Sequence, residues 1–177
     1  MLDKNPEQKP IDSLTDITTM IEQNTMNSIM YSDPFLKTAF LTQIISTTQL
    51  PKIYLDFDLL FSGYTLANMV LLPQNVTLFQ PTKNDWNETL KTVLLRLSEE
   101  KSLLVIDSLN NFFNLFDDRK EVGRLIDSYI MLLVCTAKMS KSCILLNSMA
   151  RRKNGEGWVL STTGRHIAET NSTTKIQ

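Results

Sequence analysis

The feature that most constrains the fold is a continuous apolar run that ends in a carboxylate. Residues 103–107 read Leu-Leu-Val-Ile-Asp, and a charged segment at residues 99–101 precedes them. A run without polar alternation is typical of a strand that is buried on both faces of a parallel sheet. Ligands bind at the carboxyl ends of such strands, so Asp107 stands where a site is expected. On this motif alone, the alternative that Asp107 only caps the next turn stays open.

Composition sets broad limits on the class of protein. With 177 residues, 42% hydrophobic and 21% charged, the chain is expected to form one globular domain. A net charge of -1 gives no overall attraction to nucleic acid, so such binding would need a local patch. No apolar run is long enough to cross a bilayer, and we expect no membrane association. Cys135 and Cys143 are expected to be buried free thiols, which favours a cytoplasmic location.

Predicted strands and helices alternate along most of the chain. Strands are expected at residues 28–31, 52–57, 76–79, 103–107, 142–146 and 165–168. Helices are expected after Ser13 and at residues 37–46, 86–97 and 119–139, with a loop at 110–118. The pattern predicts an α/β fold, a doubly wound and mostly parallel sheet flanked by helices, with a C-terminal β-hairpin. We expect a flexible tail at 1–12, one domain at 13–169 and a polar tail at 170–177.

A phosphate-binding loop is expected after the first strand of such a fold, and here it is degenerate. The P-loop pattern is G-x-x-x-x-G-K-[ST], in which glycines let backbone N–H groups surround the phosphates. Residues 31–38 read Tyr-Ser-Asp-Pro-Phe-Leu-Lys-Thr. Lys37 and Thr38 hold the last two positions, but Tyr31 and Leu36 replace the glycines. An acidic residue and a proline inside the loop further disfavour phosphate, so we favour Lys37 as a lysine in the first turn of a surface helix.

Further landmarks resemble the RecA/RadA/KaiC-type ATPase core over residues 28–168. Residues 54–61 read Tyr-Leu-Asp-Phe-Asp-Leu-Leu-Phe, similar to the family pattern Tyr-Ile-Asp-x-Glu-x-x-Phe. The resemblance puts Asp58 at the position of the catalytic Glu that orients water. It also implies that Asp107 is the Walker B carboxylate, a Mg²⁺ ligand if metal binds, and that Asn147 is the sensor residue. Lys37, Thr38, Asp107 and Asn147 are then the candidate nucleotide-binding residues.

The same resemblance implies a nucleic-acid contact near the C-terminal end. Residues 149–158 would correspond to the mobile DNA-binding loop of the family. Arg151, Arg152 and Lys153 are the contact candidates, and we expect them in the turn of the hairpin. The alternative for three adjacent charges is an ordinary solvated turn.

The departures from the family pattern decide the expected function. Without the loop glycines, and with Asp58 in place of Glu, the chain resembles ATPase-inactive members such as the RecA-like subunits of Elongator and inactivated archaeal KaiC-like proteins. It is expected to be a non-hydrolysing structural or regulatory subunit, in a homo- or hetero-oligomer with a RecA-like paralog. A link to nucleic acid, in DNA repair or regulation, stays open. We expect no bound cofactor.

Two alternatives from other classes remain. The first is a weak Mg-dependent ATPase, with ATP and Mg²⁺ held by a remodelled loop through Lys37, Thr38, Asp58 and Asp107. The second is a stand-alone nucleic-acid-binding domain. Two further expectations concern packing: Asp56 is structural, and the apolar residues within 112–116 form either core or a subunit contact.

Overall fold

The computed structural model describes residues 14–116, 121–153, 157–160 and 173–176, and within them the chain forms one seven-stranded sheet. The strand order is β3-β2-β4-β5-β1-β7, and β6 pairs only with β5. The strands are β1 (Met26–Tyr31), β2 (Lys52–Asp56), β3 (Val76–Phe79), β4 (Leu103–Asp107), β5 (Cys143–Lys153), β6 (Gly157–Leu160) and β7 (Thr173–Ile176). All pairs are parallel except β5 with β6. The predicted α/β class and the C-terminal β-hairpin are confirmed.

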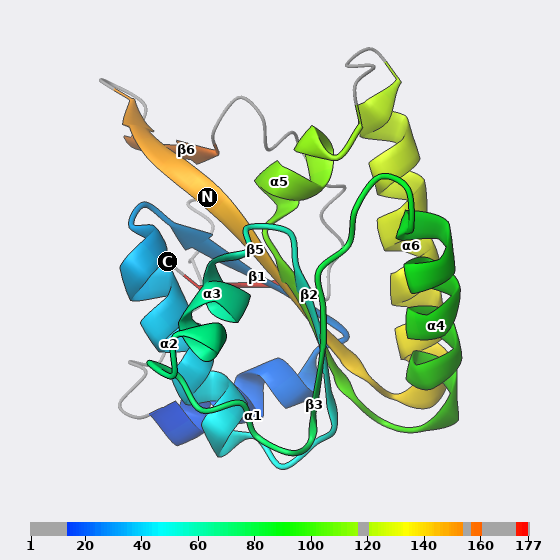
Figure 1. Ribbon diagram of the computed structural model, residues 1–177, viewed down its shortest axis with the longest axis horizontal. Helices are drawn as coiled ribbons and strands as arrows, with labels where there is room; N and C mark the ends of the chain where they lie inside the picture. The colour runs from blue at the N-terminus through cyan, green and yellow to red at the C-terminus, as the bar shows by residue number, and fades with distance from the viewer. Residues whose placement is uncertain (1–13, 117–120, 154–156, 161–172, 177) are drawn as a thin grey trace, which may run out of the picture.

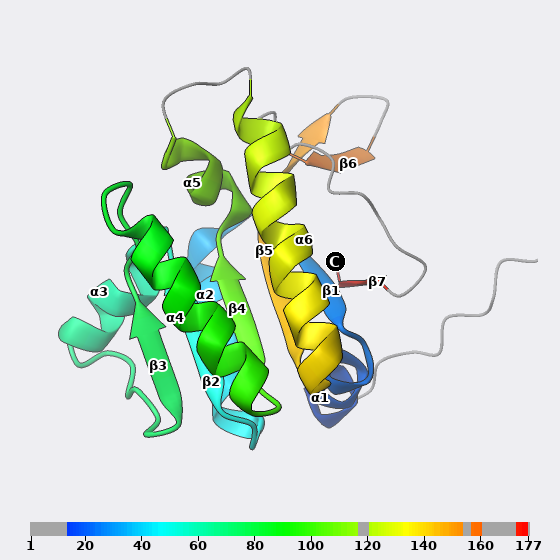
Figure 2. The same cartoon turned by 90° about the vertical axis from the view of Figure 1, so that its right-hand side faces the viewer.

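Helices cover both faces of the sheet, as the two views show (Figures 1 and 2). One core contains side chains of α1, α2 and α3, and the other contains side chains of α4, α5 and α6. The helices are α1 (Leu14–Gln23), α2 (Pro34–Thr47), α3 (Leu60–Leu66), α4 (Trp86–Glu99), α5 (Leu109–Asn114) and α6 (Val122–Ser140). Among them, none combines the length and apolar character that a membrane crossing requires.

Strand β4 lies at the centre of this arrangement and has the predicted bounds. All five of its residues are buried. Leu103 and Val105 belong to the core beneath α2, whereas Leu104 and Ile106 belong to the core beneath α4 and α6. Each such side chain contributes about 1.5–3 kcal/mol when it is buried. An uninterrupted apolar run is therefore what a strand with a helix layer on each side requires.

Two helices differ from the prediction. Helix α2 begins at Pro34, three residues before the expected start, because the Asp33 carboxylate caps it. Residues 109–114 form helix α5, where a loop was expected. The aromatic residues that suggested an irregular loop pack instead into the core, where Phe112 is fully buried. Phe112 is thus part of the core, the partly buried Phe113, Leu115 and Phe116 pack against it, and a subunit contact at this cluster stays a prediction.

The C-terminal part holds two corrections. Residues 151–153 are not a turn, because they continue β5 and pair antiparallel with β6. Thr173–Ile176 was expected in a polar tail, but it forms β7 and pairs with β1. Two threonines and an isoleucine are β-branched and favour strands, which a polarity argument overlooks. The strand expected at 165–168 and the tail at 1–12 lie outside the described residues.

The two cysteines are free and lie in different surroundings. Cys143 is buried at the start of β5, as expected. Cys135 is exposed on α6, so the expectation that both thiols are buried was wrong. The helix turns Cys135 outward because it falls between the core positions Leu133 and Ala137.

Candidate functional site

The amino-terminal end of α2 is closed by the chain's own carboxylate. The Asp33 carboxylate accepts hydrogen bonds from the backbone N–H groups of Phe35 and Leu36, at 2.7 and 3.0 Å. Pro34 at the first helical position offers no N–H. Because these are the groups that hold an anion at a helix start, the Asp33 carboxylate occupies the place that a bound anion would have. The side chains of Phe35 and Leu36 are exposed beside it.

Lys37 lies inside the protein, so the expectation of a surface lysine was wrong. Its residue is 3% exposed, and its Nζ lies 2.7 Å from Asp58 Oδ2 and 2.5 Å from Asp107 Oδ1. The ammonium also lies 4.8 Å from the ring centroid of Tyr31. A signal for this burial was present in the sequence. Lys37 stands four residues before Leu41 and therefore on the buried stripe of α2.

Asp107 is fully buried between two donors. Its Oδ1 faces the Lys37 ammonium, and its Oδ2 accepts a hydrogen bond of 2.6 Å from the Tyr54 hydroxyl. Burial raises the pKa of Asp107 to about 6, although the Lys37 charge opposes the shift. Burial, together with the Asp107 charge, also raises the pKa of Tyr54 well above its ordinary value. Tyr54 therefore remains a hydrogen-bond donor to this carboxylate.

Asp58 has both oxygens engaged. Oδ1 accepts from the Ser108 N–H at 3.1 Å, the Ser108 hydroxyl at 2.7 Å and Asn111 Nδ2 at 2.7 Å. Oδ2 accepts from Lys37, and from the Tyr31 hydroxyl at 3.4 Å. Burial acts to raise the pKa of Asp58, but the hydrogen bond and charge of Lys37, with the bonds from Ser108 and Asn111, lower it below its ordinary value.

The cluster as a whole carries a negative charge at neutral pH. Burial alone would lower the pKa of Lys37, but the neighbouring carboxylates, Asp107 first, raise it above its ordinary value. Lys37 is therefore a cation, Asp58 is an anion and Asp107 is mostly ionised. One ammonium thus compensates two carboxylates, and the remaining charge is held by hydrogen bonds.

Thr38 and Asn147 lie near this cluster but do not join it. The Thr38 hydroxyl donates to the backbone carbonyl of Pro34 at 2.9 Å, within its own helix. Asn147, on β5, is fully buried and donates from Nδ2 to the Ile106 carbonyl at 3.2 Å. Its Oδ1 is buried without a hydrogen-bond partner. Asn147 keeps one unused acceptor at the carboxyl end of the sheet.

The residues do not present a magnesium site in this arrangement. Both oxygens of Asp107 are engaged by Lys37 and Tyr54, and the Thr38 hydroxyl turns to its own helix. Within the part of the chain that the structure describes, no group of three or more His, Cys, Asp or Glu side chains is placed to hold a metal. The Lys37 ammonium occupies the position between the carboxylates that a metal cation would take.

Asp56 has the structural role that was expected. Its Oδ2 accepts from both the N–H and the hydroxyl of Ser62, each at 2.7 Å, and so fixes the start of α3 to the end of β2. Desolvation by burial raises the pKa of Asp56. Asp56 thus has a structural role between β2 and α3, whereas Asp58, two residues later, belongs to the cluster with Lys37 and Asp107.

An open hollow of about 560 Å³ adjoins the cluster at the carboxyl ends of β2 and β3. Phe57, Lys83, Asn111 and Asn114 are among its lining residues. Asn111 joins the hollow to the cluster, because it donates to Asp58 and accepts from Asn114 Nδ2 at 2.9 Å. The volume is within the range of small-molecule pockets. Nothing in the sequence pattern predicted this hollow.

Sequence reasoning missed four residues of the cluster, namely Tyr31, Tyr54, Ser108 and Asn111. A signal existed for Tyr54, which stands in the middle of a strand that is buried throughout. A buried tyrosine hydroxyl needs a hydrogen-bond partner, and Asp107 on the neighbouring strand supplies it. The other three residues carry no such signal, since their roles arise only from packing.

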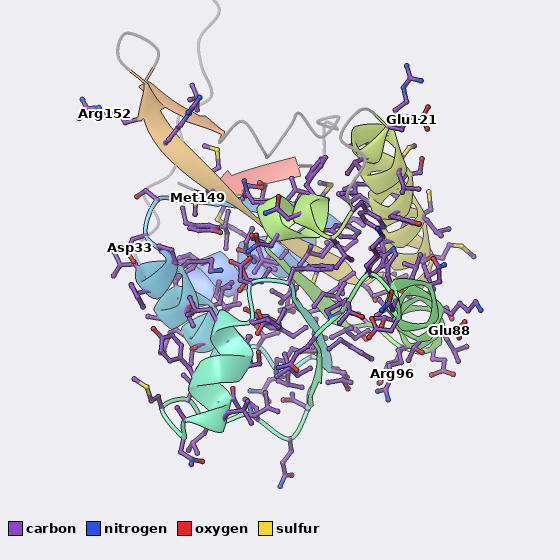
Figure 3. All side chains as sticks on the ribbon, turned by 45° about the horizontal axis from the view of Figure 1, so that its top comes forward. Asp33, Glu88, Arg96, Glu121, Met149 and Arg152 are labelled. Carbon is purple, nitrogen blue, oxygen red and sulfur yellow. The ribbon has the colours of Figure 1, made fainter. Side chains whose placement is uncertain are left out.

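The basic residues near the C-terminal end lie apart from the cluster. Arg151 and Arg152 are exposed on the ribbon of β5 and β6, opposite Val159 and Trp158. Arg152 projects from this ribbon away from the body of the domain (Figure 3). The backbone of Lys153 continues the same strand, and its side chain lies outside the described part. The structure therefore places the three predicted contact residues on one strand.

Similarity to known proteins is found among solved structures. No protein-family model and no curated protein matches the chain. A solved structure of a KaiC-like protein from the hyperthermophilic archaeon Pyrococcus horikoshii OT3 is similar, with 13% sequence identity and a TM-score of 0.49. The similarity covers 85% of this chain and 82% of that chain. The α/β architecture itself rests on the strand order and register given above.

Proposed function

We propose that this chain is a non-hydrolysing RecA-like domain that acts as a structural or regulatory subunit of an oligomeric assembly. The observation that carries the proposal is that the chain's own carboxylates already bind the groups that a phosphate would need. The Asp33 carboxylate accepts hydrogen bonds from the N–H groups at the start of α2. Asp58 and Asp107 form ion pairs with the ammonium of Lys37. The degenerate loop is thus closed by internal contacts.

Electrostatics support a loss of nucleotide affinity. A phosphate could reach Lys37 only if the ammonium left two carboxylates, one of them fully buried. Removing one partner of a buried pair costs about 3–5 kcal/mol. By the usual relation of free energy to affinity, this lowers nucleotide affinity by roughly 10²–10⁴-fold. The phosphates would also add negative charge beside Asp33, which raises the penalty further.

The hydrogen bonds of Asp58 support a loss of hydrolysis. A carboxylate that orients an attacking water needs a free oxygen within reach of that water. Asp58 Oδ1 already accepts three hydrogen bonds, and Oδ2 is paired with Lys37. The site therefore lacks an available base in this conformation.

Calorimetric titration of Mg·ATP tests the proposal. Wild type and Asp33→Ser, which keeps a capping oxygen but removes the charge, should both give no saturable heat and release no phosphate. Saturable binding with turnover that is lost in Lys37→Met would overturn the proposal in favour of a weak ATPase. Turnover that persists in Lys37→Met would identify a contaminating enzyme.

A second candidate function, nucleic-acid binding, is favoured by the exposed arginines of the β5–β6 ribbon. Two adjacent cations on a projecting strand can contact a phosphate backbone without base specificity. The test is the anisotropy of a labelled single-stranded oligonucleotide across a salt series. Replacing residues 151–153 by serine should weaken binding and flatten the salt dependence. The matched control replaces Lys101, Arg124 and Lys138, and equal loss in both variants would exclude the ribbon as the site.

A further inference from the structure

One segment of the chain stands out because it carries no charge. Residues 59–82 contain no Asp, Glu, Lys, Arg or His, although 21% of the whole chain is charged. This segment forms α3, the connection after it, and strand β3. It forms one side of the molecule, which faces the viewer in Figure 1 and lies at the left in Figure 2. A solvated face of a globular domain normally mixes charges of both signs.

The uncharged segment exposes large apolar side chains. The exposed fractions are 57% for Leu59, 80% for Leu66, 71% for Met69, 86% for Leu71 and 39% for Leu72. Leu66 is the last residue of α3, whereas Leu59 precedes the helix in a left-handed conformation and lines the hollow together with Lys83. Met69, Leu71 and Leu72 follow within six residues of Leu66, and these four exposed side chains are named here the α3 face. Apolar patches of this kind mark interaction sites.

Strand β3 beside the α3 face is an unprotected edge. It ends the strand order, and among the described strands it pairs only with β2. Exposed edges are usually protected by lysine, proline or a bulge, and residues 76–79 contain neither lysine nor proline. The guanidinium of Arg96 reaches Thr77, but it comes from α4 on the opposite face of the sheet (Figure 3). The α3 side of this edge therefore remains without charge.

The size of the α3 face matches a protein interface. Four side chains of this kind, about two-thirds exposed on average, leave on the order of 500 Å² of apolar surface. Two such faces together reach about 1,000 Å², which is the minimum expected of a biological interface. This area is reached only if the partner contributes a surface that is equally apolar and uncharged.

We propose that this partner is a second copy of the chain, bound through the same face across a two-fold axis. In a two-fold contact the same surface patch of both copies meets. A patch with a net charge would therefore face an equal charge of the same sign on its partner. The α3 face has no charge to repel, and it buries equal apolar area on both sides. The inference rests on the proposed function, because it takes the chain to be part of an oligomeric assembly. It names the contact and the partner in that assembly.

Light scattering after size exclusion tests the contact on the full chain. At micromolar concentration the wild type should have about twice the 20.2 kDa mass of one chain. The variant Leu66→Lys/Leu71→Lys should have the mass of one chain. The matched control Met131→Lys/Met139→Lys changes residues that are 68% and 87% exposed on α6, and it should keep the mass of two.

Several outcomes would overturn the contact. These are a monomeric wild type, a dimeric Leu66→Lys/Leu71→Lys variant, or a wild-type mass that grows beyond two copies, as a head-to-tail contact would give. Met69→Lys repeats the test with one substitution, should the double variant fold poorly by circular dichroism. The Mg·ATP titration on the same samples keeps the two proposals apart, since a dimer that hydrolyses ATP would refute only the pseudo-ATPase role.

Discussion

Substituting Lys37 by methionine tests the buried cluster most directly. The change removes the cation between Asp58 and Asp107 and keeps a side chain of similar length. Because Asp107 is fully buried and Lys37 is 3% exposed, water cannot replace the lost ammonium. Removing one partner of such a pair costs about 3–5 kcal/mol, and we expect a loss of that size in the free energy of unfolding near neutral pH.

The loss should depend on pH. The pKa of Asp107 is raised to about 6 by burial while Lys37 opposes the shift, so without Lys37 this pKa rises further. The native variant then holds a proton that the unfolded chain, with an ordinary pKa of 3.8, has released. Its free energy of unfolding therefore falls as pH rises through this window. The difference from wild type should be largest above about pH 7 and smaller near about pH 5.

Urea unfolding followed by the fluorescence of the buried Trp86 measures this effect at each pH. The double variant Lys37→Met/Asp107→Asn removes the second carboxylate charge and should recover part of the loss. A loss below about 1 kcal/mol at every pH, the size of an exposed ion pair, would refute a buried Lys37. A loss that does not change with pH would refute the role of Asp107.

Three further predictions use the same assay. In the wild type, Asp107 should make the free energy of unfolding fall by about 2 kcal/mol as pH rises from about 4 to 7, because its pKa is about 6 rather than 3.8. Asp107→Asn should lack that fall, and an unchanged profile would contradict it. Asp33→Ala should lose about 0.5–2 kcal/mol through the cap of α2, whereas equal stability of Asp33→Ala and Asp33→Ser would argue against capping. Phe112→Ala should lose about 3–5 kcal/mol, since the ring is buried against Phe57 and Trp86, and a loss below 1 kcal/mol would remove Phe112 from the core.

The fold could be predicted from the sequence where the signal is local. The apolar run at residues 103–107 has the bounds of β4, because burial on both faces needs no polar alternation. The apolar repeat that begins at Trp86 likewise predicted helix α4. Residues 173–176 were missed, because a short edge strand of polar β-branched residues has little local signal.

The candidate site was less predictable, because its contacts join distant residues. Asp58 and Asp107 were named from motifs, but their shared ion pair with Lys37 links positions 21 and 70 residues apart. The spacing to Leu41 indicates that Lys37 lies on the buried side of α2, but it gives no indication that two carboxylates meet the ammonium there. Asn111 was placed in a loop, so its hydrogen bond to Asp58 could not be foreseen.

The position of β1 in the sheet has a consequence for the order of folding during synthesis. Strand β1 pairs with β5 on one side and with β7 on the other, and both follow it by more than a hundred residues. Strands β2, β3 and β4 pair among themselves and can associate earlier. A ribosome must therefore release the chain through β5 and then through β7 before β1 finds both neighbours. Until β5 is released, β1, which leads directly into α2 and Lys37, has no neighbouring strand to pair with.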